Sequence, residues 1–271
     1  MTQLNLPIRL TPLLMLLAAL ALIMQGCGGD GGGGSVTPDA DPTGYYNKTG
    51  AASVDDGAGG TIMINDLQAM VSSDRIMMMS TANGLLYDGT ITNIAGNRFT
   101  ADFTVYTDGE NPINAIGSGT ISEESKIEGT LTGSGVGNGT FTLTYAQATE
   151  QQAADLVRIE DRPWDGDGQP GPNYAFVING QGVLANTAAG GFEVPIFDGC
   201  EINGTVISIN DSSLYEVTVT LTNCDDPNVD TSTTNNYTGF AVSRTNSVVD
   251  DTLVLGLSSG SYSPNGELVV Y

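Results

Sequence analysis

This sequence contains no histidine, and it is poor in lysine and arginine. It has only 8 basic residues against 31 acidic ones in a chain of 271 residues. Histidine is the commonest general base and the commonest metal ligand of proteins, so its absence excludes Ser–His and Cys–His catalysis within the chain. Acidic pairs such as Glu123–Glu124 fall in polar turns, where carboxylates titrate normally. The sequence therefore predicts a protein that is not an enzyme and that holds no metal ion and no other cofactor.

The excess of acid also restricts the partners of the chain. The formal net charge is −23 at pH 7. Such a charge repels nucleic acid and anionic lipid headgroups, and it favours solubility. The simplest interpretation of the acidic residues is a solvated surface, and we expect no nucleic-acid partner.

Long apolar runs are missing as well, apart from one near the N-terminus. Residues 10–24 read LTPLLMLLAALALIM, which is shorter than the roughly 20 residues of a transmembrane helix. A weakly basic start with Arg9 precedes this run, and Gly26 and Cys27 follow it. This order is typical of a secretory signal. We therefore predict that residues 1–26 form a signal peptide.

Cys27 gives this signal a more specific interpretation. Residues 22–27 read LIMQGC, and the glycine-rich stretch GGDGGGGS follows. This resembles the signal of bacterial lipoproteins, in which an aliphatic residue, a small residue and Gly or Ala precede the cysteine. The resemblance implies cleavage before Cys27 and modification of that cysteine with lipid, palmitate included. An ordinary secretory signal that leaves Cys27 as a free thiol is the alternative.

The residues after Cys27 extend this expectation. Gly28 stands where an Asp would retain such a protein in the inner membrane of enteric-type bacteria, so the resemblance implies the outer membrane, at its periplasmic face or at the cell surface. Glycine makes the first half of 27–43 flexible, and Pro38 and Pro42 stiffen the second half. We expect 27–43 to be a lipidated tether between the membrane and a folded part.

Short alternating strands dominate the chain after this tether. The stretch FTADFTVYT at 99–107 places Phe99 and Phe103 on one face and polar residues on the other. A Gly-Thr phrase that recurs at 89, 119, 129 and 139 indicates strand entries. Further strands are expected near 44–49, 61–71, 75–81, 85–94, 113–122, 126–133 and 140–145. About eight strands within 44–146 predict an antiparallel β-barrel or β-sandwich.

A second β-unit is expected at 173–271, after a linker at 147–172 that contains a short helix capped by Thr149. Residues 87–107 parallel residues 202–222, because both combine a Gly-Thr strand, a polar turn and a Thr/Val strand. The stretch 117–122 similarly parallels 237–243. We interpret these similarities as a duplication of the β-unit, and convergence of strands with similar composition is the alternative. The predicted fold is all-β, with two small barrels or sandwiches.

The other two cysteines fit into one hairpin of this second unit. With strands at 201–209 and 214–223 and a turn at 210–213, pairing centred on Ser212 places Cys200 opposite Cys224. Residues directly opposite each other in an antiparallel pair are within disulfide range. We therefore predict a Cys200–Cys224 disulfide, which requires the oxidising compartment that export provides. Cys27 is then the odd cysteine that remains for lipid attachment.

The chain as a whole resembles uncharacterised two-part β-rich lipoproteins of Gram-negative bacteria with lipocalin-like barrels. The residues that carry this resemblance are the lipoprotein signal, the Gly-Thr strands and the segment 199–239 with its two cysteines. It implies a non-catalytic binding module, held at the membrane by its lipid, whose partner is another envelope or extracellular protein or a small apolar ligand. If a barrel encloses a cavity, we expect its lining to include Met77, Met79, Phe99 and Phe103. A structural or envelope-assembly role without a ligand is the main alternative, and a hydrolase is the weaker one.

Overall fold

The computed structural model describes residues 38–107, 110–150, 152–162, 164–165, 176–185, 201–222, 236–245, 251–259 and 265–270. The predicted signal peptide, the first part of the tether and all three cysteines lie outside these ranges. Residues 38–271 form one compact unit. Within the described ranges, no helix is both long enough and apolar enough to cross a bilayer.

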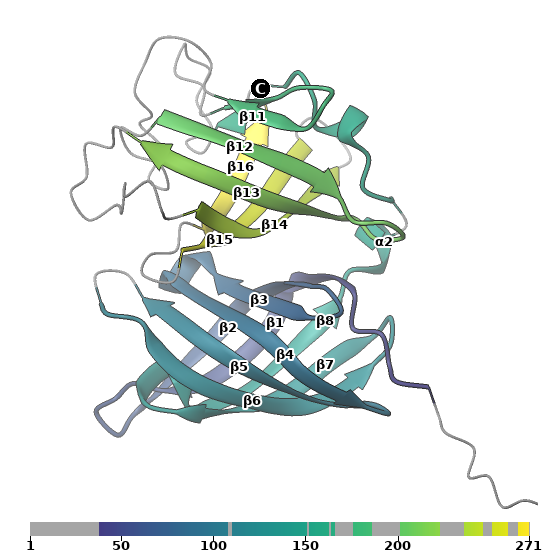
Figure 1. Ribbon diagram of the computed structural model, residues 1–271. Coiled ribbons are helices and arrows are strands. Elements are labelled where there is room, and N and C mark those ends of the chain that lie inside the picture. The colour runs from purple at the N-terminus through teal and green to yellow at the C-terminus, as the bar shows by residue number, and fades with distance from the viewer. Residues whose placement is uncertain are drawn as a thin grey trace, which may run out of the picture. The chain divides into compact units, whose positions relative to one another are not determined.

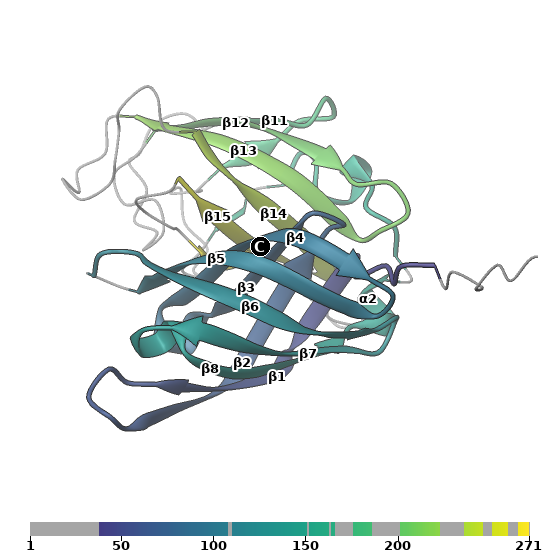
Figure 2. The same ribbon diagram turned by 60° about the horizontal axis from the view of Figure 1, so that its bottom comes forward.

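The first half of this unit is a closed barrel of eight antiparallel strands (Figures 1 and 2). Each strand pairs with the next one along the chain, and the first strand closes the barrel by pairing with the eighth at six positions. The strands are β1 (Gly44–Asp55), β2 (Thr61–Val71), β3 (Arg75–Ser80), β4 (Leu85–Ala95), β5 (Arg98–Thr107), β6 (Ile113–Ser122), β7 (Lys126–Gly133) and β8 (Gly139–Tyr145). The prediction of an eight-stranded β-unit in this region is confirmed.

Alternation along the strands separates the barrel interior from its outer face. On β5, Phe99 and Phe103 are buried in the interior cluster, whereas Thr100 and Asp102 are exposed. The same cluster takes Phe141 and Leu143 from β8. Because successive side chains of a strand point to opposite faces, the apolar/polar pattern in the sequence determines which face packs inside. The predicted facing of both strands is confirmed.

The recurring glycines make room for aromatic rings and do not mark strand entries as predicted. Gly89 and Gly129 lie within β4 and β7, and only Gly139 begins a strand. A Cβ at Gly89 would come within 2.4 Å of the Phe103 ring, and a Cβ at Gly117 within 2.3 Å of its other side. The ring of Phe103 therefore lies between two strands whose glycines have no side chain. Small and large residues alternate in this way inside small barrels.

The described part of the predicted linker at 147–172, which comprises 147–150, 152–162 and 164–165, contains little helix and contributes a strand to the second half. The α-helix α2 (Gln147–Glu150) has only one turn, and a 3-10 turn η3 (Leu156–Arg158) follows. The short helix predicted here is present, but Thr149 lies inside α2 and does not cap it, so the predicted cap was wrong. The strand β9 (Trp164–Asp165) then joins the second sheet, where the indole N–H of Trp164 donates to the carbonyl of Ile159 at 3.0 Å.

The second half is another eight-stranded antiparallel sheet, with the order β10-β11-β12-β13-β14-β15-β16-β9. One isolated bridge between Trp164 of β9 and Phe176, next to β10, joins its two edges. Its own core cluster includes Trp164, Phe176 and Tyr237. The other strands are β10 (Val177–Ile178), β11 (Val183–Ala185), β12 (Glu201–Ser208), β13 (Leu214–Thr222), β14 (Asn236–Thr245), β15 (Asp251–Ser258) and β16 (Asn265–Val270).

The two halves have a similar strand order, because the first strand pairs with the last in both, β1 with β8 and β9 with β16. Counted from β1 and from β9, residues 87–107 occupy the fourth and fifth strands of the barrel, and residues 202–222 occupy the fourth and fifth strands of the second sheet. Residues 117–122 and 237–243 both lie on sixth strands. The sequence similarities thus fall on equivalent strands, which supports the duplication that the sequence predicts.

The register of the hairpin β12–β13 differs by one residue from the predicted register. Ser208 pairs with Tyr215, whereas the prediction placed Ile209 opposite Tyr215. The N–H of Ile209 instead donates to the carbonyl of Leu214, so the turn contains the four residues 210–213. A four-residue turn at 210–213 centres the pairing between Asp211 and Ser212, and not on Ser212, so the register that was predicted to place Cys200 opposite Cys224 is not the observed one. The geometric argument for their disulfide was therefore wrong, and both cysteines lie outside the described residues.

The outer face of the barrel packs against the outer face of the second sheet. An apolar cluster combines Met70, Met77 and Met79 of the barrel with Phe240 and other residues of β13, β14 and β15. Gly256 of β15 lies so close to this layer that a Cβ there would come within 2.6 Å of the Met79 methyl carbon. Thioether side chains adapt well to such irregular contacts. Met77 and Met79 thus pack between the two sheets, whereas Met78 points into the barrel interior.

Polar groups flank this apolar layer on the chain that links the two halves. The Glu150 carboxylate on α2 accepts hydrogen bonds from the backbone N–H of Tyr45 at 2.5 Å and from that of Ser213 at 3.1 Å. The Tyr45 hydroxyl donates to the Gln68 side chain at 2.7 Å. One acidic side chain therefore connects a barrel strand with the β12–β13 turn, and this arrangement satisfies backbone donors that packing would otherwise leave unpaired.

Candidate functional site

The four residues that the sequence suggested for ligand binding do not line one cavity. Met77 and Met79 lie on the outer face of β3, fully buried against the second sheet. Phe99 and Phe103 point from β5 into the barrel interior. The alternation that put Met77 and Met79 on one face was correct. Because β3 is buried on both faces, however, the pattern did not reveal which face belonged to the barrel interior.

The barrel interior around these aromatic residues is filled by side chains. The Phe103 ring occupies the space beside Gly89 and Gly117, and a Cβ at Gly119 would come within 2.8 Å of Phe99. An eight-stranded barrel is just wide enough either to be filled by side chains or to hold one small ligand. These contacts leave no room for a ligand between Phe103 and the neighbouring strands.

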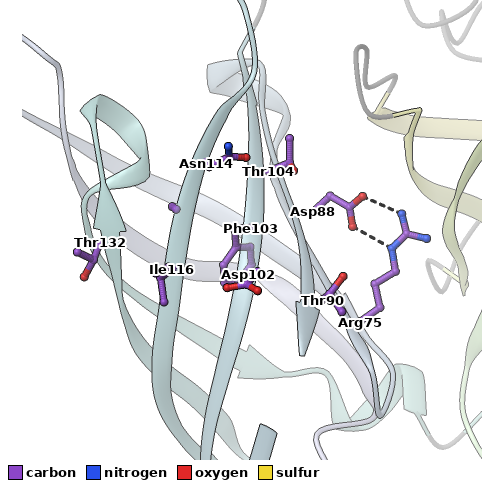
Figure 3. Close-up of a pocket in the computed structure, with 10 residues that line it drawn as sticks. Arg75, Asp88, Thr90, Asp102, Phe103, Thr104, Asn114, Ile116 and Thr132 are labelled. Atoms are coloured by element: carbon purple, nitrogen blue, oxygen red, sulfur yellow. Dashed lines mark hydrogen bonds and ion pairs between the residues drawn. The ribbon is translucent and has the colours of Figure 1, made fainter. Parts of the chain in front are cut away.

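An open hollow lies on the outer face of the barrel, across strands β4–β7 (Figure 3). Its volume is about 770 Å³, which is within the range of about 300–1,000 Å³ that is usual for ligand sites. The residues that line it are mainly polar, with three apolar residues among them. The polar ones are Thr90, Asp102, Thr104, Asn114 and Thr132, with Arg75 and Asp88 at one end, and the apolar ones are Phe103, Ala115 and Ile116.

Strand pairing brings these side chains together from four strands. Asp102 pairs with Thr90 on one side and with Ile116 on the other, and Ile116 pairs in turn with Thr132. Directly opposite side chains on one face have Cβ atoms about 4.5–5.5 Å apart. The four residues thus form one row across β4–β7. Thr104 and Asn114 are paired beside this row and lie next to each other in Figure 3.

The charged end of the hollow is held by a polar network that reaches the second sheet. Nε and Nη2 of Arg75 donate to the two carboxylate oxygens of Asp88 at 2.8 and 2.9 Å. The same guanidinium donates to the hydroxyl and the carbonyl of Thr238 and to the hydroxyl of Ser258. Ser258 also donates to Asp88. Arg75 and Asp88 thus neutralise each other, and Ser258 is hydrogen-bonded to both of them.

A second, smaller hollow lies at the end of the barrel where the chain enters β1. Its lining includes four acidic residues: Asp41, Glu123, Glu124 and Asp211. Burial, together with the charges of Glu150, Glu124 and Asp41, raises the pKa of Tyr145 in this hollow to about 12. Within the described ranges, no group of three or more carboxylates is arranged to hold a metal ion.

Sequence reasoning missed the hollow over β4–β7 because its residues look like an ordinary solvated strand face. Threonine and asparagine on exposed strands are common, and nothing in a single sequence shows that the surface they form is concave. The one available signal was Ile116, which is an apolar residue on the outward face of β6, where the other residues are polar. Ile116 is 60% exposed. Cys27, the predicted lipid site, lies outside the described residues.

A scan against protein-family models found no match for this chain, and searches of curated proteins and of solved structures found none either. Any functional argument therefore depends on the residues of this chain alone.

Proposed function

We propose that this chain is a lipid-anchored protein of the bacterial cell envelope, placed in the outer membrane, and that it acts as a non-catalytic binding module. In this proposal, Cys27 carries the lipid and residues 28–37 give the folded unit its distance from the membrane, since the compact unit begins at Pro38. The ligand or partner binds in the hollow on the outer face of β4–β7.

The observation that carries this proposal is the contrast between the hollow and the barrel interior. Asp102 and Asn114 are exposed polar residues in a concave surface, and convergent polar groups in a concave site are the usual mark of ligand binding. The interior position beside Phe103, by contrast, is occupied by packed side chains. We therefore propose a binding surface on the outer face of the barrel, whereas the sequence suggested one in the barrel interior.

The chain ahead of the barrel supports the anchored part of the proposal. Residues 38–43 run along one end of the barrel, where the N–H of Ala40 donates to the carbonyl of Gly96 at 2.7 Å. Asp39 accepts from the N–H of Gly96 at 2.8 Å, and the N–H of Asp41 donates to Glu123 at 2.9 Å. These bonds fix the point at which a tether from Cys27 would reach the folded unit.

Metabolic labelling with palmitate tests the anchor. We expect the label to enter the wild-type chain and to be absent from a Cys27→Ser variant. Equal labelling of both chains, or none in the wild type, would contradict lipidation at Cys27. Mass spectrometry of the N-terminal peptide would locate the modification directly.

Native purification with the lipid intact tests the binding part. Mass spectrometry of co-purified small molecules and cross-linked proteins should identify a species that the wild type retains and that an Asp102→Ala/Asn114→Ala variant loses. Thr144→Ala, an exposed residue on the outer face of β8, is the matched control and should retain it. A species that is bound equally by all three chains would contradict the hollow as the site. The absence of any such species would favour the structural role.

A further inference from the structure

The hydrogen-bonding groups that remain available in the hollow belong to Thr90, Asp102, Thr104, Asn114 and Thr132. Within the described ranges, none of these side chains has a hydrogen-bond partner, and only Thr104 is partly buried. They offer one carboxylate, one amide and three hydroxyl groups. The amide and the hydroxyls can both donate and accept, whereas the carboxylate accepts only.

The charges of the hollow disfavour an anionic ligand. The guanidinium of Arg75 is paired with the Asp88 carboxylate and also donates to Thr238 and Ser258. Asp102 is then the one charged side chain of the hollow without an ionic partner among the described residues. A negative group on a ligand would meet that carboxylate, in a chain whose net charge is −23.

The remaining groups suit a ligand with several hydroxyl groups and an apolar side. A carboxylate accepts hydrogen bonds at both of its oxygens, so Asp102 can hold two neighbouring hydroxyls. Ile116 pairs directly with Asp102 on the adjacent strand, and its side chain is 60% exposed. An apolar surface therefore lies beside the carboxylate, as a sugar ring with hydroxyls at its edge and C–H groups on its face requires.

We infer that the hollow binds a neutral saccharide, an inference that rests on the proposed function of the hollow as the binding site. Asp102 and Asn114 bind hydroxyl groups of one sugar ring, and Ile116 contacts the C–H face of that ring. Thr90 and Thr132 lie at the two ends of the row and bind hydroxyls farther along the ligand. The hollow, at about 770 Å³, is large enough for more than one sugar unit.

Isothermal titration calorimetry of the full chain tests this inference with maltotriose, cellotriose and chitotriose as probes. The protein is kept in a detergent without a sugar headgroup, because such a headgroup would compete. We expect saturable binding of at least one trisaccharide. Asp102→Ala should weaken that binding at least tenfold, and Asn114→Ala about three- to tenfold, since charged hydrogen bonds contribute more than neutral ones. Glu128→Gln removes an exposed carboxylate of β7 outside the hollow and should leave binding unchanged.

Three results would overturn the inference. One is that none of the three trisaccharides binds to the wild-type chain. A second is that a trisaccharide binds to the Asp102→Ala variant as tightly as to the wild type, which would show that Asp102 is not part of the binding site. The third is that spermine binds in the hollow and the saccharides do not, which would assign Asp102 to a cation. If the wild type instead retains a protein partner that Asp102→Ala/Asn114→Ala loses, the proposed function stands and only the saccharide is wrong.

Discussion

The contact between Phe103 and Gly117 gives the sharpest test of the barrel interior. A Cβ at Gly117 would lie 2.3 Å from Cε2 and 3.0 Å from Cδ2 of the Phe103 ring, against a favourable separation of about 3.5–4.0 Å. The ring cannot move away, because Gly89 lies against its other edge. Overpacking of a filled core lowers stability by about 1–3 kcal/mol. We expect Gly117→Ala to lower the free energy of unfolding by about 3 kcal/mol. For a unit of this size, this corresponds to a decrease of about 6–12 °C in melting temperature.

Urea unfolding of Gly117→Ala in two backgrounds measures this effect. In a Phe103→Leu chain the ring is gone, and the same substitution should be neutral or stabilise by up to about 1 kcal/mol, because glycine weakens a strand relative to alanine. Ser118→Ala, on the exposed side of the same strand, should stay within about 0.5 kcal/mol. The reasoning is refuted if Gly117→Ala is harmless in the wild-type chain, or if its effect is the same in both backgrounds.

Three further predictions concern the packing of the two sheets and the buried tyrosines. Arg75→Ala should lower the free energy of unfolding by about 1–3 kcal/mol, because it leaves Asp88 without its ionic partner; Arg98→Ala, exposed on β5, should change it by less than about 0.5 kcal/mol. Met77→Ala should lower it by about 2–5 kcal/mol, since Met77 is fully buried, whereas Met63→Ala at a side chain that is 60% exposed should have little effect; denaturant unfolding compares each pair. Burial raises the pKa of Tyr87 above its ordinary value, so the folded chain keeps this proton where the unfolded chain loses it. The contribution of Tyr87 to the free energy of unfolding should therefore be constant below about pH 10 and should fall as the pH rises above it. Above about pH 10, the free energy of unfolding should fall less steeply with pH in Tyr87→Phe than in the wild type, and equal slopes in the two chains would contradict burial of that hydroxyl.

The strands of the barrel were predictable because one physical rule determines them. On β5, apolar residues alternate with polar ones from Phe99 to Val105, and over this stretch the strand is buried on one side only, so the pattern and the structure agree. The strand β3 has buried residues on both sides, and there the pattern identified Met77 and Met79 as neighbours without showing what they contact. The residue pattern of one strand does not show that a second sheet covers its outer face.

The hairpin register and the short strands of the second sheet were harder to predict. A change of one residue in the turn at 210–213 alters every pair along β12–β13, and the apolar residues Val206 and Ile207 allow either choice. The structure selects Val206 for the core and leaves Ile207 60% exposed. The strand β9 has two residues, too few for any periodicity, so Trp164 looked like part of a linker.

The candidate site could not be predicted because it depends on the shape of a surface. Thr90, Asp102 and Thr132 are far apart in the sequence and meet only through strand pairing. Their alternation with interior residues predicts that they point outward, and this was correct. The hollow itself forms from the paired strands together, which local sequence patterns do not describe.

The most direct test of the central claim is photo-cross-linking in cells with a photoreactive residue in place of Ile116. A second chain carries the same residue in place of Thr144, which is also exposed but lies outside the hollow. The account predicts a defined adduct from position 116 that disappears when Asp102→Ala is added, and no such adduct from position 144. The claim that this protein binds through the hollow is contradicted if neither position gives an adduct, if both give the same one, or if Asp102→Ala leaves the adduct from position 116 unchanged.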